Sequence, residues 1–154
     1  MIEIRFTIKG THEGPSNNPI PKLKMTGRQH WTPNARRYTK WKEHCVAALI
    51  EELAKRSPAA AREAAKNYAA LGKPLVLATR RARMDIVIVW SDGHHGDPEN
   101  IFGSIADALF HNDKYLSGSF DFKDEPGEGQ VDILLTISEQ RTWKQKSKPK
   151  RKIR

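Results

Sequence analysis

The sequence predicts an α/β (α+β) domain in which helices pack on a mixed sheet, in the order β-α-α-β-α-β-β. Apolar and polar side chains alternate in the first and last strand-like segments, as in half-buried strands. Apolar side chains recur at helical spacing between residues 33 and 54, and proline and glycine mark the boundaries of the segments. A chain of 154 residues has the length of one ordinary domain.

The first half predicts one strand and two helices. Residues 2–8 alternate and form the strand, and a loop rich in Pro, Gly and Asn follows. Thr32 caps a helix that has Pro33 at its first position. A second helix begins after Ser57 and ends at Gly72.

The second half predicts strands around one further helix. Residues 74–79 and 84–90 are strand-like, and the latter segment is apolar enough near its end to be covered on both faces. A helix then runs from Pro98 to about Phe110. The segments 115–122 and 131–137 flank a turn rich in Pro and Gly, which predicts a closing hairpin.

The positive charge is concentrated at the C-terminus. The net charge is +9, but residues 141–154 hold eight Lys or Arg and no acid, which leaves 19 basic against 18 acidic residues before them. We therefore expect a domain over 1–140 and a disordered basic tail over 141–154 that suits a nucleic-acid backbone. A tail that only promotes solubility is the alternative. The tail cations taken as DNA contacts are Lys144, Lys146, Lys148, Lys150, Arg151 and Lys152.

The composition favours a cytoplasmic protein. The single cysteine, Cys45, cannot form an internal disulfide and is expected to be a small buried apolar residue. No segment has the length and apolarity of a membrane span, and the start MIEIRFTI is too short and too charged for a signal peptide.

Acidic and amide side chains gather in the run Asp97-Pro98-Glu99-Asn100. Carboxylate oxygens are preferred ligands of Mg²⁺, and such sites are completed by water and phosphate oxygens. The same run also suits a plain helix start, because Asp97 is a good N-cap and Glu99 complements the helix dipole. Asn100 can donate to a carboxylate or accept from a metal-bound water.

A second polar pair, Asn112-Asp113, is expected where the same helix ends. Asparagine is a suitable C-terminal cap, but an acid at that end opposes the helix dipole. Asp113 is therefore a stronger functional candidate than Asp97. A helix of this length spans about 19 Å. Asp97 and Asp113 meet only if the chain folds back or a dimer partner delivers Asp113.

Three ordered pieces resemble the RusA family of Holliday-junction resolvases, over roughly residues 2–138. They are Pro15-Ser16-Asn17-Asn18, the D-x-D-N-like run 97–100 leading to Asp107-Ala108-Leu109, and the Asn112-Asp113 pair before the closing strands. The resemblance implies a homodimeric endonuclease that hydrolyses DNA phosphodiesters at four-way junctions in recombination and repair, with Mg²⁺ or Mn²⁺. It makes Asp97, Glu99 and Asp113 the catalytic metal ligands, with Asn100, Asn112 and Asp107 as supporting residues.

The chain departs from the family at two positions. Glu99 stands where the family has aspartate, which lengthens the ligand by one methylene. Gly103 stands where the family tends to have a helpful lysine, a role that Lys114, His94 or His95 could take.

Two other interpretations stay open. His94 and His95, beside Asp92 and Asp97, could bind Zn²⁺ instead. The chain could also be a non-catalytic binder of branched or single-stranded DNA that stacks bases on tryptophans and contacts phosphates through its tail and helix 33–54. The residues considered for these contacts are Trp31, Trp41, Trp90 and Trp143, and the cations Arg36, Arg37, Lys40, Lys42, Arg80, Arg81, Arg83 and Lys114. Trp41 and Trp90 are expected in the core.

Overall fold

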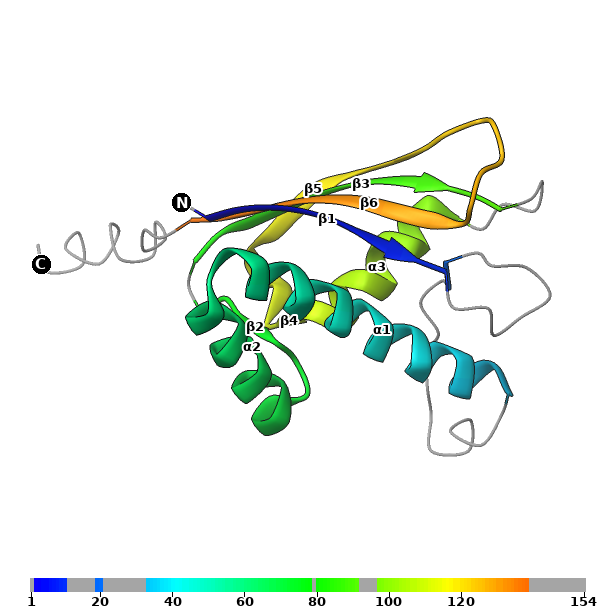
Figure 1. Cartoon of the computed structure of the whole chain (residues 1–154). Coiled ribbons are helices and arrows are strands. Elements are labelled where there is room, and N and C mark those ends of the chain that lie inside the picture. The colour runs from blue at the N-terminus through cyan, green and yellow to red at the C-terminus, as the bar shows by residue number, and fades with distance from the viewer. Residues whose placement is uncertain (1, 11–18, 21–32, 79, 92–96, 139–154) are drawn as a thin grey trace, which may run out of the picture.

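The computed structural model describes residues 2–10, 19–20, 33–78, 80–91 and 97–138. Within these ranges, a mixed sheet lies over a layer of helices (Figure 1). This arrangement confirms the predicted class, a mixed α/β domain with helices packed on a mixed sheet.

The sheet of the described residues has four strands in the order β1-β6-β3-β5. They are β1 (Ile2–Lys9), β6 (Gln130–Ile137), β3 (Ala82–Val89) and β5 (Leu116–Phe122). β6 pairs antiparallel with both β1 and β3, and β3 pairs parallel with β5. The strand following residues 97–109 thus runs beside the strand preceding them, as in a β-α-β crossover.

The predicted closing hairpin is wrong, although both of its strands are present. β3 lies between β5 and β6, so the two strands do not pair with each other. β6 buries every second side chain and takes an inner position, whereas β5 buries almost nothing and takes an edge. The connection crosses the end of β3, where the Gly127 N–H donates to the Trp90 carbonyl (2.7 Å). Gly127 passes so close to the Val89 side chain that an added Cβ would collide with it. The connection thus partly covers the second face of β3 near its end, where the sequence predicted cover on both faces.

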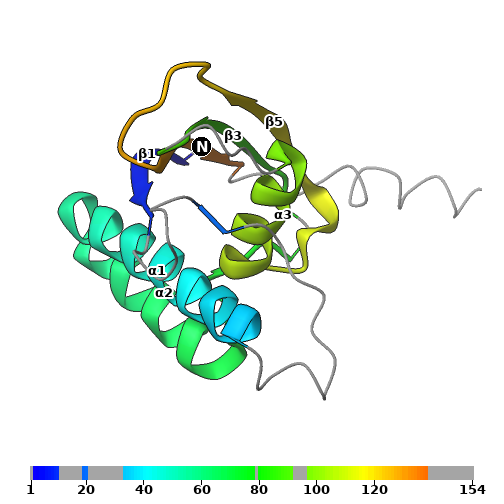
Figure 2. The same cartoon turned by 90° about the vertical axis from the view of Figure 1, so that its right-hand side faces the viewer.

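Three helices lie on one side of the sheet within the described residues: α1 (Pro33–Arg56), α2 (Pro58–Leu71) and α3 (Pro98–Leu109). Figure 2 shows them beneath the strands. Ser57 and the left-handed Gly72 cap α2 as predicted. Pro33 begins α1, also as predicted.

The core lies between the sheet and the helices. Trp41 and Trp90 are fully buried there, and so is Cys45, as the sequence predicts. The Trp41 indole N–H donates to the Ser104 hydroxyl (3.0 Å), which joins α1 to α3 inside the core. Burial raises the pKa of the Cys45 thiol, so this cysteine is suited to packing rather than to reaction.

Short elements connect these parts. β2 (Leu75–Val76) covers only part of the predicted strand 74–79, and it pairs parallel with β4 (Phe110–His111). A single turn of 3₁₀ helix, η2 (Asp113–Tyr115), precedes β5. None of the helices formed by the described residues is long and apolar enough to cross a membrane.

Candidate functional site

Asp97 and Glu99 stand at the start of α3, next to the end of β3. Asp97 is the N-cap, with extended backbone (φ −82°, ψ 120°), and its Oδ1 accepts from the Glu99 N–H (2.9 Å). Pro98 fills the first helical position, where its missing N–H costs nothing. The capping interpretation is therefore confirmed. Both carboxylates are exposed to solvent.

Capping leaves most of this acidic pair available. It uses one oxygen of Asp97, and within the described residues neither Asp97 nor Glu99 forms an ion pair. Asn100, the next residue, is also exposed on the first turn. Two carboxylates on one rigid helix start, with no cation of the described residues paired with them, suit a hard divalent cation that keeps several waters.

The described residues hold no group of three or more His, Cys, Asp or Glu side chains that could bind a metal ion. A metal at the start of α3 would need further ligands besides the carboxylates of the described residues. Since Mg²⁺ ordinarily binds through one or two carboxylates with water and phosphate oxygens, the pair fits such an ion.

Asp113 lies elsewhere than the sequence predicted. α3 ends at Leu109, and β4 separates it from Asn112, which is left-handed (φ 61°) and precedes η2. Asp113 is thus in the first turn of a short 3₁₀ helix, where an acid is not unfavourable. The argument that it opposes the dipole of α3 is therefore wrong. The Asp113 side chain is exposed.

The fold does not bring Asp113 to Asp97 within one chain. In the parallel β3–β5 register, Leu116 is aligned with Ala82, so Asp113 lies near the beginning of β3. Asp97 follows the other end of β3. α3 has 12 residues and joins the two sides, a span of about 18 Å. Folding back, one of the two predicted ways of joining these acids, does not occur among the described residues.

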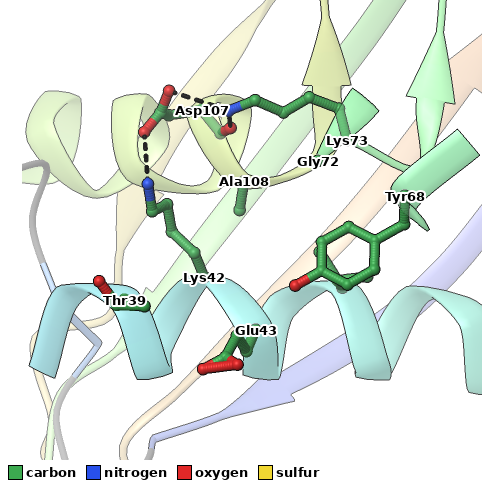
Figure 3. A pocket seen from close by; sticks show the side chains of 9 residues that line it. Thr39, Lys42, Glu43, Tyr68, Gly72, Lys73, Asp107 and Ala108 are labelled. Carbon is green, nitrogen blue, oxygen red and sulfur yellow. Dashed lines mark hydrogen bonds and ion pairs between the residues drawn. The ribbon is translucent and has the colours of Figure 1, made fainter. Parts of the chain in front are cut away.

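Asp107 occupies the far end of α3 and has partners of its own. Its carboxylate accepts from the Tyr38 hydroxyl (2.7 Å) and forms ion pairs with Lys42 (3.4 Å) and Lys73 (3.2 Å). Figure 3 shows both ammonium groups converging on it from α1 and from the residue after Gly72. Lys73 also donates to the Asp107 backbone carbonyl. Asp107 is about 15 Å along the helix from Asp97.

The Asp107 cluster borders a cavity of about 340 Å³ between α1, α2 and α3. Burial raises the pKa of Asp107, but the Tyr38 hydrogen bond and the two ammonium groups outweigh it, so the net pKa is lowered. Burial, and then the hydrogen bond and charge of Asp107, raise the pKa of Tyr38. One carboxylate thus faces two ammonium groups and a hydroxyl, so the cluster joins three segments and has no acid left over for a cation.

The predicted DNA contacts fall in two places in the described part of the chain. Arg36 and Lys40 are exposed near the start of α1, and Arg37 is half-buried there. The first turn of α1 carries no acidic residue. Lys114 is exposed, with its Nζ 5.7 Å from the centre of the Tyr115 ring. In Figure 1, α1 begins on the side of the molecule at which β3 ends.

Several predicted features lie outside the described residues. They are residues 15–18, Thr32, Trp31, the Asp92, His94 and His95 group, Trp143 and the six tail cations. Sequence reasoning did not anticipate Lys73 or Tyr38 as partners of Asp107. No signal in one sequence could have found them, because residues 38, 73 and 107 meet only in the folded chain.

Comparison with known proteins adds no assignment: no protein-family model matches the chain, and no curated protein matches it.

Proposed function

We propose that this protein is a Mg²⁺-dependent, structure-selective DNA endonuclease of the RusA type that cleaves four-way junctions. One observation carries the proposal. Asp97 and Glu99 stand exposed at the start of α3 with no neutralising cation among the described residues, in a protein whose net charge is +9. Exposed, unpaired carboxylates in a basic chain suit a metal ion that is held against a polyanion.

The residues at the start of α3 have distinct roles in this proposal. Asp97 Oδ2 and the Glu99 carboxylate bind the cation, while Asp97 Oδ1 keeps the cap and so fixes the direction of the ligand. Asn100 orients a water or a phosphate oxygen from the same turn. Mg²⁺, when bound, lowers the pKa of an attacking water and stabilises charge developing on the phosphate.

Asp113 completes the site from a second subunit. Its place near the beginning of β3, opposite to Asp97, supports this version. A four-way junction has near two-fold symmetry, so a dimer with two-fold symmetry presents equivalent sites to two opposed strands.

Basic residues supply the affinity for DNA. Arg36, Arg37 and Lys40 contact phosphates from the start of α1, together with Lys114 and the tail cations. Phosphate contacts of this kind release counterions, so binding to the junction weakens as salt rises.

The decisive experiment is cleavage of a synthetic four-way junction with Mg²⁺. Asp97→Asn removes the charge but keeps a good cap, and Asp124→Asn, in the exposed β5–β6 connection, is the matched control. Paired symmetric nicks by wild type and Asp124→Asn, lost in Asp97→Asn, would support the proposal. Intact junctions under both Mg²⁺ and Mn²⁺ would overturn it.

Mixing subunits tests the shared site. Asp97→Asn and Asp113→Asn chains are inactive alone, but a mixed dimer retains one site with all its acids. Partial recovery of cleavage on mixing the two variants supports the shared site. No recovery of cleavage, when both variants are folded, rejects it.

A non-catalytic DNA binder is the second candidate, favoured by the exposed cations Arg36 and Lys40 near the start of α1. Such a protein binds junctions equally well or better after Asp97→Asn, and it nicks DNA with no divalent ion. Zinc dependence, the remaining alternative, would instead show as activity lost only to tight Zn²⁺ chelators.

A further inference from the structure

β5 is an edge strand, and most of its residues are exposed to solvent. Within the described residues it pairs only with β3, and every residue from Ser117 to Phe122 is exposed. Phe120 and Phe122 expose 44% and 37% of their surface, although they lie on the face that holds the helices. The Phe120 ring is 6.0 Å from Phe102 of α3. The edge therefore carries an apolar strip that continues the core outward.

The outer edge of β5 presents backbone groups at alternate residues. The Lys123 N–H donates to the Ile88 carbonyl (2.9 Å), so odd-numbered residues face β3. Because strand backbone groups alternate, the N–H and C=O of Gly118 and Phe120 point away from β3. The Phe122 N–H also points outward, but it donates to the Asp121 side chain (2.8 Å).

Among the described residues, charged side chains protect the opposite edge of the sheet, whereas β5 has almost no such protection. β1 carries Glu3, Arg5 and Lys9, and the Arg56 side chain donates to the Glu3 carbonyl (3.3 Å). Charges of this kind discourage strand pairing. β5 carries only Asp121 as a charged residue.

We propose that β5 pairs antiparallel with β5 of a second copy of this chain, about a two-fold axis that passes between the two Ser119 residues. In this register Gly118 of each chain faces Phe120 of the other, and these residues exchange four backbone hydrogen bonds. The Phe122 N–H is not needed. The two four-stranded sheets become one continuous sheet with all helices on one face.

Side chains agree with this register on both faces. Phe120 covers the bare Gly118 of the other chain, a pairing that stabilises glycine in strands. Gly118 is required on other grounds, since an added Cβ would collide with the Met84 carbonyl. On the polar face Asp121 lies opposite Ser117, whose hydroxyl would donate to it in place of its long hydrogen bond to the Ala82 carbonyl (3.5 Å).

The register has a consequence for the metal site, and this consequence rests on the proposed function. Leu116 of the partner subunit faces Phe122, which is aligned with Ile88 near the end of β3. Asp113 of the partner subunit comes three residues earlier and lies further in the same direction. It therefore approaches the side of the molecule where β3 ends and Asp97 begins α3.

Disulfide trapping tests the interface. Residues that meet on the axis as a non-hydrogen-bonded pair have Cα atoms about 4.5 Å apart, within the range of a disulfide. Ser119→Cys should therefore give a covalent dimer on mild oxidation. Ser117→Cys, on the same strand and face, should give no covalent dimer, because its two copies lie about 14 Å apart along the strands. Wild type controls for Cys45, which is fully buried.

No covalent dimer from Ser119→Cys, or equal trapping at both positions, would overturn the proposal. Phe120→Lys provides a second test. Circular dichroism should show that this variant is folded, and sedimentation should show that it is a monomer where wild type is a dimer. A folded Phe120→Lys dimer would count against the strand pairing. Interface and activity fail separately. A covalent dimer of Ser119→Cys together with no junction cleavage by wild type would support the interface and reject the nuclease. Junction cleavage by wild type together with no covalent dimer would support the nuclease and reject the interface.

Discussion

The two ends of α3 carry acids in opposite circumstances. At the beginning, Asp97 and Glu99 are exposed and no cation of the described residues is paired with them. Near the end, Asp107 is half-buried and held by Tyr38, Lys42 and Lys73. One helix thus separates a satisfied carboxylate from two that are available to a ligand.

A structural acid can be distinguished from a candidate metal ligand by how many of its oxygens already accept hydrogen bonds. A carboxylate whose oxygens already accept from a hydroxyl and two ammonium groups contributes to stability and has little left for a metal. At the start of α3, the carboxylates contribute to stability only through the Asp97 cap and through their place at the positive end of the helix dipole. Substitutions at the two ends should therefore separate activity from stability.

The largest effect is expected for Glu99→Gln. The change removes a proposed metal ligand, so junction cleavage with Mg²⁺ should fall at least about a hundredfold. The melting temperature should fall by no more than a few degrees, because the Glu99 carboxylate has no side-chain partner in the described residues and only complements the dipole of α3. Initial rates and thermal melts check both parts, with the exposed Glu125→Gln as control. Unchanged cleavage would end the distinction between the two helix ends.

Asp107→Asn should have the reverse effect. Two ammonium groups lose their shared anion, which costs about 1–2 kcal/mol of unfolding free energy. For a chain of this size the melting temperature should fall by roughly 3–8 °C. Junction cleavage at 25 °C should persist in the folded protein. Loss of cleavage without loss of stability would place Asp107 in the site after all.

Asp97→Ala should separate the effect of the helix cap from the effect of the negative charge. Both Asp97→Ala and Asp97→Asn remove the charge, but only alanine removes the cap, at a cost of about 1 kcal/mol. Thermal melts should therefore place Asp97→Ala a few degrees below Asp97→Asn, with cleavage lost in both. Equal melting temperatures would mean that the cap contributes nothing.

The smallest expected effect is on pH dependence. The folded pKa of Asp107 lies below its ordinary value, so its stabilisation is present above the ordinary aspartate pKa and is lost as pH falls through the folded value. The gap in melting temperature between wild type and Asp107→Asn should be constant from pH 5 to 7, and it should shrink below about pH 4. A gap that widens in acid would contradict the ion-pair explanation.

Local patterns predicted the elements well, and long-range pairing was where they failed. Ser57 and Gly72 bound α2 as expected, and Asp97 caps α3. The hairpin prediction failed because a turn signal predicts only that the chain reverses direction, whereas strand order depends on which strand has the more apolar side chains. β6 is the more apolar strand and occupies the inner position.

The candidate site was predictable only in part, for the same reason. The acidic run at residues 97–100 follows from sequence alone. The partners of Asp107 come from positions 38, 42 and 73, and no local spacing links them. Asp113 was misplaced because the sequence does not show that α3 ends at Leu109 and that β4 intervenes.

The central claim is that a divalent cation binds at the beginning of α3. Titration with Mn²⁺, which broadens nearby NMR signals, tests it directly in the intact protein. The amide signals of Glu99 and Asn100 should broaden first, together with that of Asp113 if two subunits share the site, while those of Ala106 and Asp107 stay sharp. Broadening centred on Asp107, or none at either end of the helix, would contradict the account.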